Sequence, residues 1–309
     1  MLWGFMKKMV IANVLAPWVK DVFVNYPEYI GMTAFVGILM YSIQIYADFS
    51  GYMDIMCGFC QMLGIKLAEN FNRPYFAKSI AEYWRRWHTT MGAWFKKYIY
   101  FPVAMSTWSR KLGKKTQKLG KHFSETFPAT LALLLTWGAT GLWHGASWAY
   151  IVWGLVNGAF LILNLWLEPI YAWSRRVFRI DASKPTWKVI LVARSFFLVS
   201  LIKVIPEVGT LSQGLGLIGR AFTEHTFTTS FYTIFPFLQG ENMIKLAALS
   251  CMLVLWIITS VLQRKKPIRD YFAKWPIWLR VAALIAIFFI IVVVGIPASK
   301  EGSFLYEAF

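Results

Sequence analysis

The chain has 309 residues, of which 58% are apolar, 18% aromatic and only 15% charged. Soluble globular domains carry about a quarter of charged residues, so this composition argues against a soluble domain and favours a polytopic membrane protein. The net charge of +17 does not indicate a nucleic-acid-binding protein, because the basic residues cluster between apolar runs, as in cytoplasmic loops.

The predicted membrane helices are apolar runs close to the roughly 20 residues that a helix needs to cross the hydrocarbon core. Residues 126–167 contain no Asp, Glu, Lys or Arg and are too many for one crossing. Because glycines interrupt this run, we expect a hairpin of two helices there. In chain order, the predicted spans are 29–47 with a shorter apolar piece at 51–65, 127–143, 147–167, 187–205, 243–262 and 281–299.

The charges of the connecting segments alternate in a way that orients the later helices. Segments 110–121, 175–184 and 264–280 are basic, whereas 206–242 has one cation and three glutamates. Basic loops face the cytoplasm, so the acidic segment and the C-terminus are expected on the outer face of the membrane.

The segment 73–121 differs from the rest, because it holds 12 of the 32 basic residues and many aromatic ones. This mixture is typical of helices that lie in the membrane interface. Its cations could bind anionic lipid or attract a phosphate-bearing donor, and the sequence favours neither. If residues 84–88 form a continuous helix, Trp84 and His88 share one face of it.

Motifs of several other enzyme classes are missing. None of the four histidines has an aspartate five residues on, and there is no G-x-S-x-G, H-E-x-x-H or Walker-type loop. The glycines 141/145, 154/158 and 214/216/219 are interpreted as helix-packing positions, and Cys57 and Cys60 as small packing residues rather than a metal pair. His144 stands out, because an ionisable group in an uncharged membrane segment indicates a functional site.

Four sequence blocks carry a resemblance: Gln44–Asp54 (QIYADFSGYMD), Glu69–Tyr75 (ENFNRPY), Tyr83–His88 (YWRRWH) and Gly141–Ala146 (GLWHGA). In this order they resemble the membrane-bound O-acyltransferase family, most closely its bacterial branch of alginate O-acetylation and teichoic acid D-alanylation. The resemblance implies one all-α domain over 1–309, with helices ringed around a central funnel. The chain is expected to lack the first helices of the family.

The resemblance also implies an activity: transfer of an acyl group, expected to be acetyl, towards hydroxyls of an extracytoplasmic polysaccharide. The donor would be a cytoplasmic thioester of coenzyme A or an acyl carrier protein, with no bound cofactor or metal. An esterase-like extracytoplasmic partner is expected to complete the transfer. D-alanyl transfer, lipid acylation, a noncatalytic scaffold and a transporter remain the alternatives.

The candidate catalytic residues are His144 and His88, which match the two histidines of the family. A buried, neutral His144 could remove the proton of the attacking hydroxyl, while His88 could orient the acceptor or donate to the oxyanion. The candidate substrate-binding residues are Asp48, Asp54, Asn72, Arg73, Arg85, Arg86, Trp87 and Trp143. Within that set, the two aspartates are expected to form buried ion pairs or helix caps rather than to act as bases.

Overall fold

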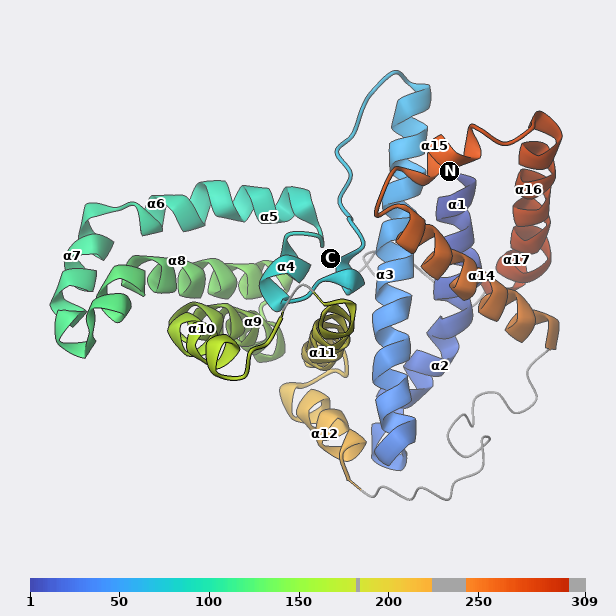
Figure 1. The fold of residues 1–309 in the computed structure, drawn as a ribbon. Helices are drawn as coiled ribbons and strands as arrows, with labels where there is room; N and C mark the ends of the chain where they lie inside the picture. Colours follow the sequence, from blue (N-terminus) through green and yellow to red (C-terminus); the bar gives the residue numbers. More distant parts are fainter. Residues whose placement is uncertain (182–183, 224–242, 300–309) are drawn as a thin grey trace. The chain divides into compact units, whose positions relative to one another are not determined.

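The structure is a computed structural model that describes residues 1–181, 184–223 and 243–299 (Figure 1). Within these ranges every regular element is a helix, and the single β-type pairing is an isolated bridge. The predicted all-α fold is therefore confirmed. Glu224, His225 and Glu241 of the acidic segment lie outside the described residues.

The chain divides into two compact units, residues 1–69 with 216–309 and residues 70–215, and each is described by itself. The first is built on α3 (Gly31–Met62), a single helix that contains both the predicted span 29–47 and most of the apolar piece behind it. Packed against α3 are the N-terminal helices α1 (Leu2–Phe5), η1 (Met6–Ala12) and α2 (Asn13–Val24). The unit continues with η2 (Tyr26–Glu28), α14 (Met243–Leu262), α15 (Ile268–Phe272), α16 (Ile277–Ile290), η7 (Ile291–Gly295) and α17 (Ile296–Ser299).

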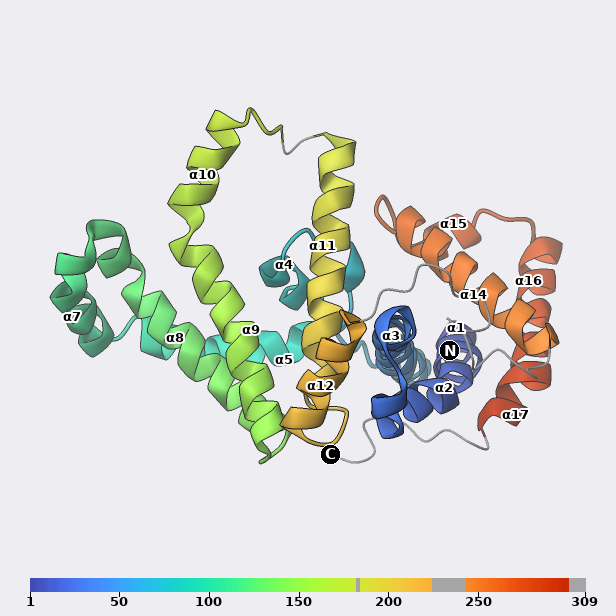
Figure 2. The same cartoon turned by 90° about the horizontal axis from the view of Figure 1, so that it is seen from below.

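The second unit contains both candidate histidines. Its long helices are α8 (Lys121–His144), α9 (Trp148–Trp166) and α11 (Pro185–Val204). η4 (Lys96–Tyr100) and α6 (Phe101–Ala104) lie along α8 (Figure 1). Figure 2 shows α10 (Glu168–Val177) and α11 lying apart from each other. The shorter helices are η3 (Pro74–Phe76), α4 (Ile80–Trp84), α5 (Thr89–Phe95), η4 (Lys96–Tyr100), α6 (Phe101–Ala104), α7 (Thr107–Lys115), η5 (Thr116–Leu119) and α10 (Glu168–Val177). α12 (Leu211–Ala221) lies across the boundary of the two units.

The predicted hairpin is present as α8 and α9, and glycines bring the two helices together. A Cβ at Gly141 would lie 2.5 Å from the carbonyl oxygen of Tyr150, and one at Gly154 would collide with the carbonyl oxygen of Trp137. Because no larger residue fits at this contact, the packing role predicted for these glycines is confirmed.

In the described part of the chain, four helical stretches are long and apolar enough to cross a membrane: Gly31–Met62, Trp148–Trp166, Met243–Leu262 and Ile277–Ser299. They support the predicted membrane protein. The predicted spans 127–143 and 187–205 form helices α8 and α11 but fall outside this set. The funnel and the interfacial position of 73–121 stay predictions.

Candidate active site

His88 lies at a break between two short helices. α4 ends at Trp84, α5 begins at Thr89, and His88 has a left-handed backbone with φ of 45°. The prediction that Trp84 and His88 share a helical face is therefore wrong, because the chain leaves the helix after α4. A non-glycine residue in this region stores strain of about 1–3 kcal/mol, which is a feature of functional sites.

A short antiparallel pairing holds the break in place. Phe71 forms a β-bridge with Trp87, and the Thr89 N–H donates to the Asn70 carbonyl at 3.1 Å. The rings of Phe71 and Trp87 also meet edge to face, with centroids 5.0 Å apart. The block around Asn70 therefore positions the block that carries His88.

The side chain of Asn70 determines which nitrogen of His88 carries the proton. Asn70 is buried, and its Oδ1 accepts from the Thr90 N–H at 3.1 Å and the Thr90 hydroxyl at 2.6 Å. The backbone N–H can only donate, so the atom facing it must be the amide oxygen. His88 Nδ1 lies 3.2 Å from the same oxygen and must therefore donate to it. Neutral His88 consequently has a lone pair on Nε2.

His144 is the last residue of α8 and sits among aromatic rings. Its imidazole meets Trp143 and Trp153 edge to face, at centroid distances of 4.8 and 4.9 Å, and stacks on Tyr150 at 6.2 Å. A Cβ at Gly145 would lie 2.6 Å from the Tyr150 ring, so the glycine permits this stack. These surroundings hold the ring in place with apolar faces.

An aromatic cluster joins the His88 segment to the α8–α9 hairpin. Trp84 packs against Trp137 and Trp153 at centroid distances of 4.7 and 5.8 Å. Its Nε1–H donates to Oδ1 of the buried Asn157 at 3.0 Å. The hydrogen bond satisfies the indole and fixes α4 on α9.

Both histidines are kept neutral by their surroundings. Burial lowers the pKa of His88 to about 4. Burial, together with a smaller effect of the charge that His88 carries when protonated, lowers the pKa of His144 to about 4. The second effect means that the two imidazoles are close enough to interact electrostatically. At neutral pH each imidazole is neutral and keeps one ring nitrogen unprotonated.

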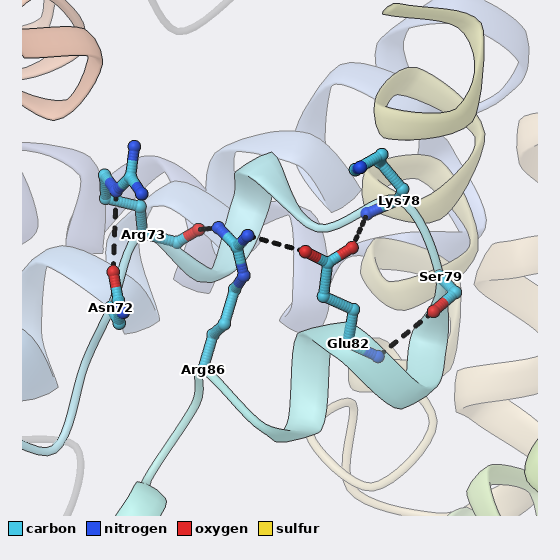
Figure 3. A network of polar contacts seen from close by, with 6 residues as sticks. All are labelled: Asn72, Arg73, Lys78, Ser79, Glu82 and Arg86. Atoms are coloured by element: carbon cyan, nitrogen blue, oxygen red, sulfur yellow. Dashed lines mark hydrogen bonds and ion pairs between the residues drawn. The ribbon is translucent and has the colours of Figure 1, made fainter. Parts of the chain in front are cut away.

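Arg86 belongs to an internal network rather than to an open surface (Figure 3). Its guanidinium pairs with Glu82 at 2.6 Å and donates to the Arg73 carbonyl at 3.3 Å. Burial opposes ionisation of Glu82, but the Lys78 N–H and the Arg86 charge outweigh it and lower the pKa of Glu82. Arg86 therefore stabilises the turn before His88. The backbone of Arg73 is also left-handed, with φ of 47°. Its Nε donates to Asn72 Oδ1 at 3.5 Å.

Arg85 and Lys96 are exposed and line a cavity of about 840 Å³ beside the histidine segment. Trp87 and Thr89, which flank His88, also belong to its wall, and the rest is mainly apolar. The cavity therefore combines an apolar interior with two cations.

Trp143, another candidate substrate-binding residue, is 57% exposed near the end of α8.

Asp48 and Asp54 lie in the other unit, where each pairs with a lysine of η1. Lys8 Nζ is 2.6 Å from Asp48, with both side chains buried. Lys7 Nζ is 2.8 Å from Asp54, whose side chain is 44% exposed. The expected ion pairs are confirmed, and the pair of Asp48 is the fully buried one.

Two residues that sequence reasoning did not select support the histidine segment. One is Asn70, which lies inside the quoted block 69–75. The other is the buried Lys203, whose Nζ lies 3.4 Å from the centroid of the Trp87 ring and donates to the Tyr75 hydroxyl at 3.1 Å. Lys203 is a cation near the end of a largely apolar predicted helix, and this position was the signal in the sequence that could have identified it.

Among the described residues, no group of three or more His, Cys, Asp or Glu could hold a metal ion.

A sequence model of the membrane-bound O-acyltransferase family matches residues 8–198, which include both histidines. The chain belongs to the membrane-bound O-acyltransferase family. Among its membrane-bound O-acyltransferase relatives, a probable alginate O-acetylase AlgI of Azotobacter vinelandii is 34% identical over 227 residues, which are 74% of this chain and 40% of the relative. A peptidoglycan O-acetyltransferase of Helicobacter pylori is 35% identical over 161 residues, 52% of this chain and 28% of the relative.

A more distant relative is a teichoic acid D-alanyltransferase of Streptococcus thermophilus, 25% identical over 170 residues that make up 53% of this chain and 39% of the relative. The chain therefore spans about two fifths or less of the length of these three relatives. The predicted resemblance to this branch of the membrane-bound O-acyltransferase family is confirmed.

Proposed function

We propose that this chain carries the transfer site of a membrane O-acyltransferase, which moves an acetyl group from a cytoplasmic thioester towards hydroxyls of an extracytoplasmic polysaccharide. The observation that carries the proposal is the pair of half-buried, neutral histidines, close enough to interact electrostatically. Relatives that are named as an alginate O-acetylase and a peptidoglycan O-acetyltransferase support the choice of acetyl.

The reaction forms one ester bond and breaks one thioester bond. His144 accepts the proton of the acceptor hydroxyl as the oxygen attacks the thioester carbonyl, which is typically worth about 10²–10⁴-fold in rate. The tetrahedral intermediate expels the thiolate, which receives the proton back from His144. Thiol and ester are the products, so protons and electrons balance without a further reactant.

The tautomer of His88 supports one of its two predicted roles. With its proton held on Nδ1 by Asn70, neutral His88 presents a lone pair at Nε2 and has no second proton to give to an oxyanion. His88 would therefore accept a hydrogen bond from a neighbouring hydroxyl of the acceptor sugar and orient the sugar, while the attacking hydroxyl donates its own proton to His144.

The cavity beside the histidine segment fits the thioester donor. Arg85 and Lys96 supply positive charge for the phosphates of coenzyme A or of a carrier-protein prosthetic group, and the apolar walls suit the pantetheine arm. The acceptor polymer would be reached through an esterase-like partner outside the inner membrane. D-alanyl transfer is the second candidate, favoured by the relative that is a teichoic acid D-alanyltransferase.

The test is release of free thiol from acetyl-coenzyme A by membranes that contain the chain. His144→Ala should abolish release, whereas His122→Ala should retain it. His122 is a matched control, because it is an exposed histidine at the opposite end of α8, where its Nε2 lies 3.2 Å from the Leu165 carbonyl. Equal thiol release by the two variants would remove His144 from the mechanism.

A further inference from the structure

A second cavity, of about 530 Å³, lies in the unit of residues 70–215. α9, α10, α11 and residues 78–81 line it. Most of its wall is apolar. The apolar lining includes Phe160, Leu163, Leu167, Trp187, Leu191 and Leu198.

Among the described residues, three cations and no acidic residue line this cavity: Lys78, Arg175 and Arg194. Arg175 is 3.6 Å from the exposed Glu168, and Lys78 lies near enough to Glu82 to affect its ionisation. Neither glutamate lines the cavity, so its lining carries a net positive charge.

Arg194 is the cation that most favours an anionic ligand. It lies near the middle of α11, is exposed, and its Nη2 donates to the Lys78 carbonyl at 3.1 Å. A carbonyl accepts from one N–H but does not neutralise the charge. Because a guanidinium has five N–H donors, it can also bind the oxygens of a phosphate in the cavity.

A buried hydroxyl gives an independent indication of a ligand. Ser195, next to Arg194, is 2% exposed and lines the same cavity. Within the described part of the chain its Oγ has no hydrogen-bond partner. A buried hydroxyl without a partner costs free energy, which a ligand oxygen would recover.

We propose that this cavity binds an anionic phospholipid. Its phosphate would meet the Arg194 guanidinium and its acyl chains would lie on the apolar wall. α10 fits the setting, because Ile170, Trp173 and Val177 are more than half exposed on a helix that ends with two arginines, a pattern typical of membrane-interface helices. The lipid would border the proposed donor cavity, with which this one shares Ala81, Leu161 and Asn164.

Native mass spectrometry of the full chain in detergent tests the proposal, with palmitoyl-oleoyl-phosphatidylglycerol, the matching phosphatidylcholine, inorganic phosphate and coenzyme A as probes. The wild type should retain phosphatidylglycerol in preference to phosphatidylcholine. Arg194→Gln should weaken that retention about tenfold, the scale of one charge-assisted hydrogen bond. Lys111→Gln removes the same charge from the exposed face of α7 and should leave retention unchanged.

A cavity-filling variant keeps the test decisive if Arg194→Gln does not fold. Leu163 is 45% exposed and lines the cavity, so Leu163→Trp should be tolerated and should displace the lipid without changing any charge. Equal retention of the two lipids, or equal losses in Arg194→Gln and Lys111→Gln, would overturn the proposal. Displacement of phosphatidylglycerol by coenzyme A or by phosphate alone would also overturn it, by assigning the cavity to the donor or to a free anion.

Discussion

Asn70 should control the protonation of His88, and replacing it by aspartate tests this most sharply. Asn70→Asp keeps the oxygen that accepts from Thr90 and from His88 Nδ1, which lies 3.2 Å away, but adds a negative charge. An opposite charge at this range raises a histidine pKa by about 1–3 units. The pKa of His88 should therefore rise from about 4 towards neutrality.

The matched variants separate charge from shape. Asn70→Ala removes the oxygen that accepts from Thr90 and His88. The variant should lose about 1–3 kcal/mol of stability. Its transfer rate should fall by up to about tenfold, which corresponds to one net hydrogen bond. Asn72→Asp introduces the same charge at an exposed position of the same block and should leave the pKa of His88 unchanged.

The assays are ¹⁵N NMR of the imidazoles, since the chain has only four histidines, and the pH dependence of acyl transfer. In the wild type His88 should remain neutral down to about pH 4 with its proton on Nδ1. In Asn70→Asp the titration should move up and the transfer rate should fall as the pH drops below neutrality. A titration curve of Asn70→Asp that coincides with the wild type would refute the reasoning.

Three further predictions concern packing, ion pairing and pH. Gly154→Ala should destabilise the α8–α9 hairpin by about 1–3 kcal/mol, because the new Cβ would collide with a backbone carbonyl. At Gly138 the nearest atom to an added Cβ is 3.9 Å away. Gly138→Ala should therefore be neutral or stabilising in a thermal unfolding assay. Lys8→Met should lower the free energy of unfolding by about 3–5 kcal/mol, because it removes the cation that pairs with the buried Asp48. Adding Asp48→Leu should recover most of that stability. A double variant that shows no recovery in chemical denaturation would contradict the ion pair. Burial lowers the pKa of His144 to about 4, below its value of about 6.5 in the unfolded chain. The rate of transfer should therefore not change with pH above about pH 5, and the free energy of unfolding should fall as the pH drops below about 6.5. An inflection of the rate near pH 6.5 would contradict the assignment.

The sequence predicted the elements whose signal is local. The predicted helices 127–143 and 147–167 correspond to α8 and α9 within a few residues, because a long uncharged run interrupted by glycines has few other interpretations. The N-terminal helices η1 and α2 were not predicted. Two lysines and a proline interrupt their apolar pattern, and only the partner carboxylates on α3 make the lysines acceptable in a buried position.

The sequence indicated candidate residues for the site but not their geometry. His88 and His144 were selected, and Asp48 was expected to be ion-paired. The helix break at His88 depends on the pairing of Phe71 with Trp87, a contact between residues distant in sequence that no local pattern encodes. For the same reason Asn70 and Lys203 were missed, since their partners lie far along the chain.

Mass spectrometry of cell-surface polymers tests the central claim most directly. Cells would express the wild type, His144→Ala or His122→Ala at matched membrane abundance. The account predicts an O-acetyl mass increment on a surface polysaccharide in the wild type and in His122→Ala, and its loss in His144→Ala. An increment that persists in His144→Ala would contradict the account, because transfer would then proceed without the proposed base.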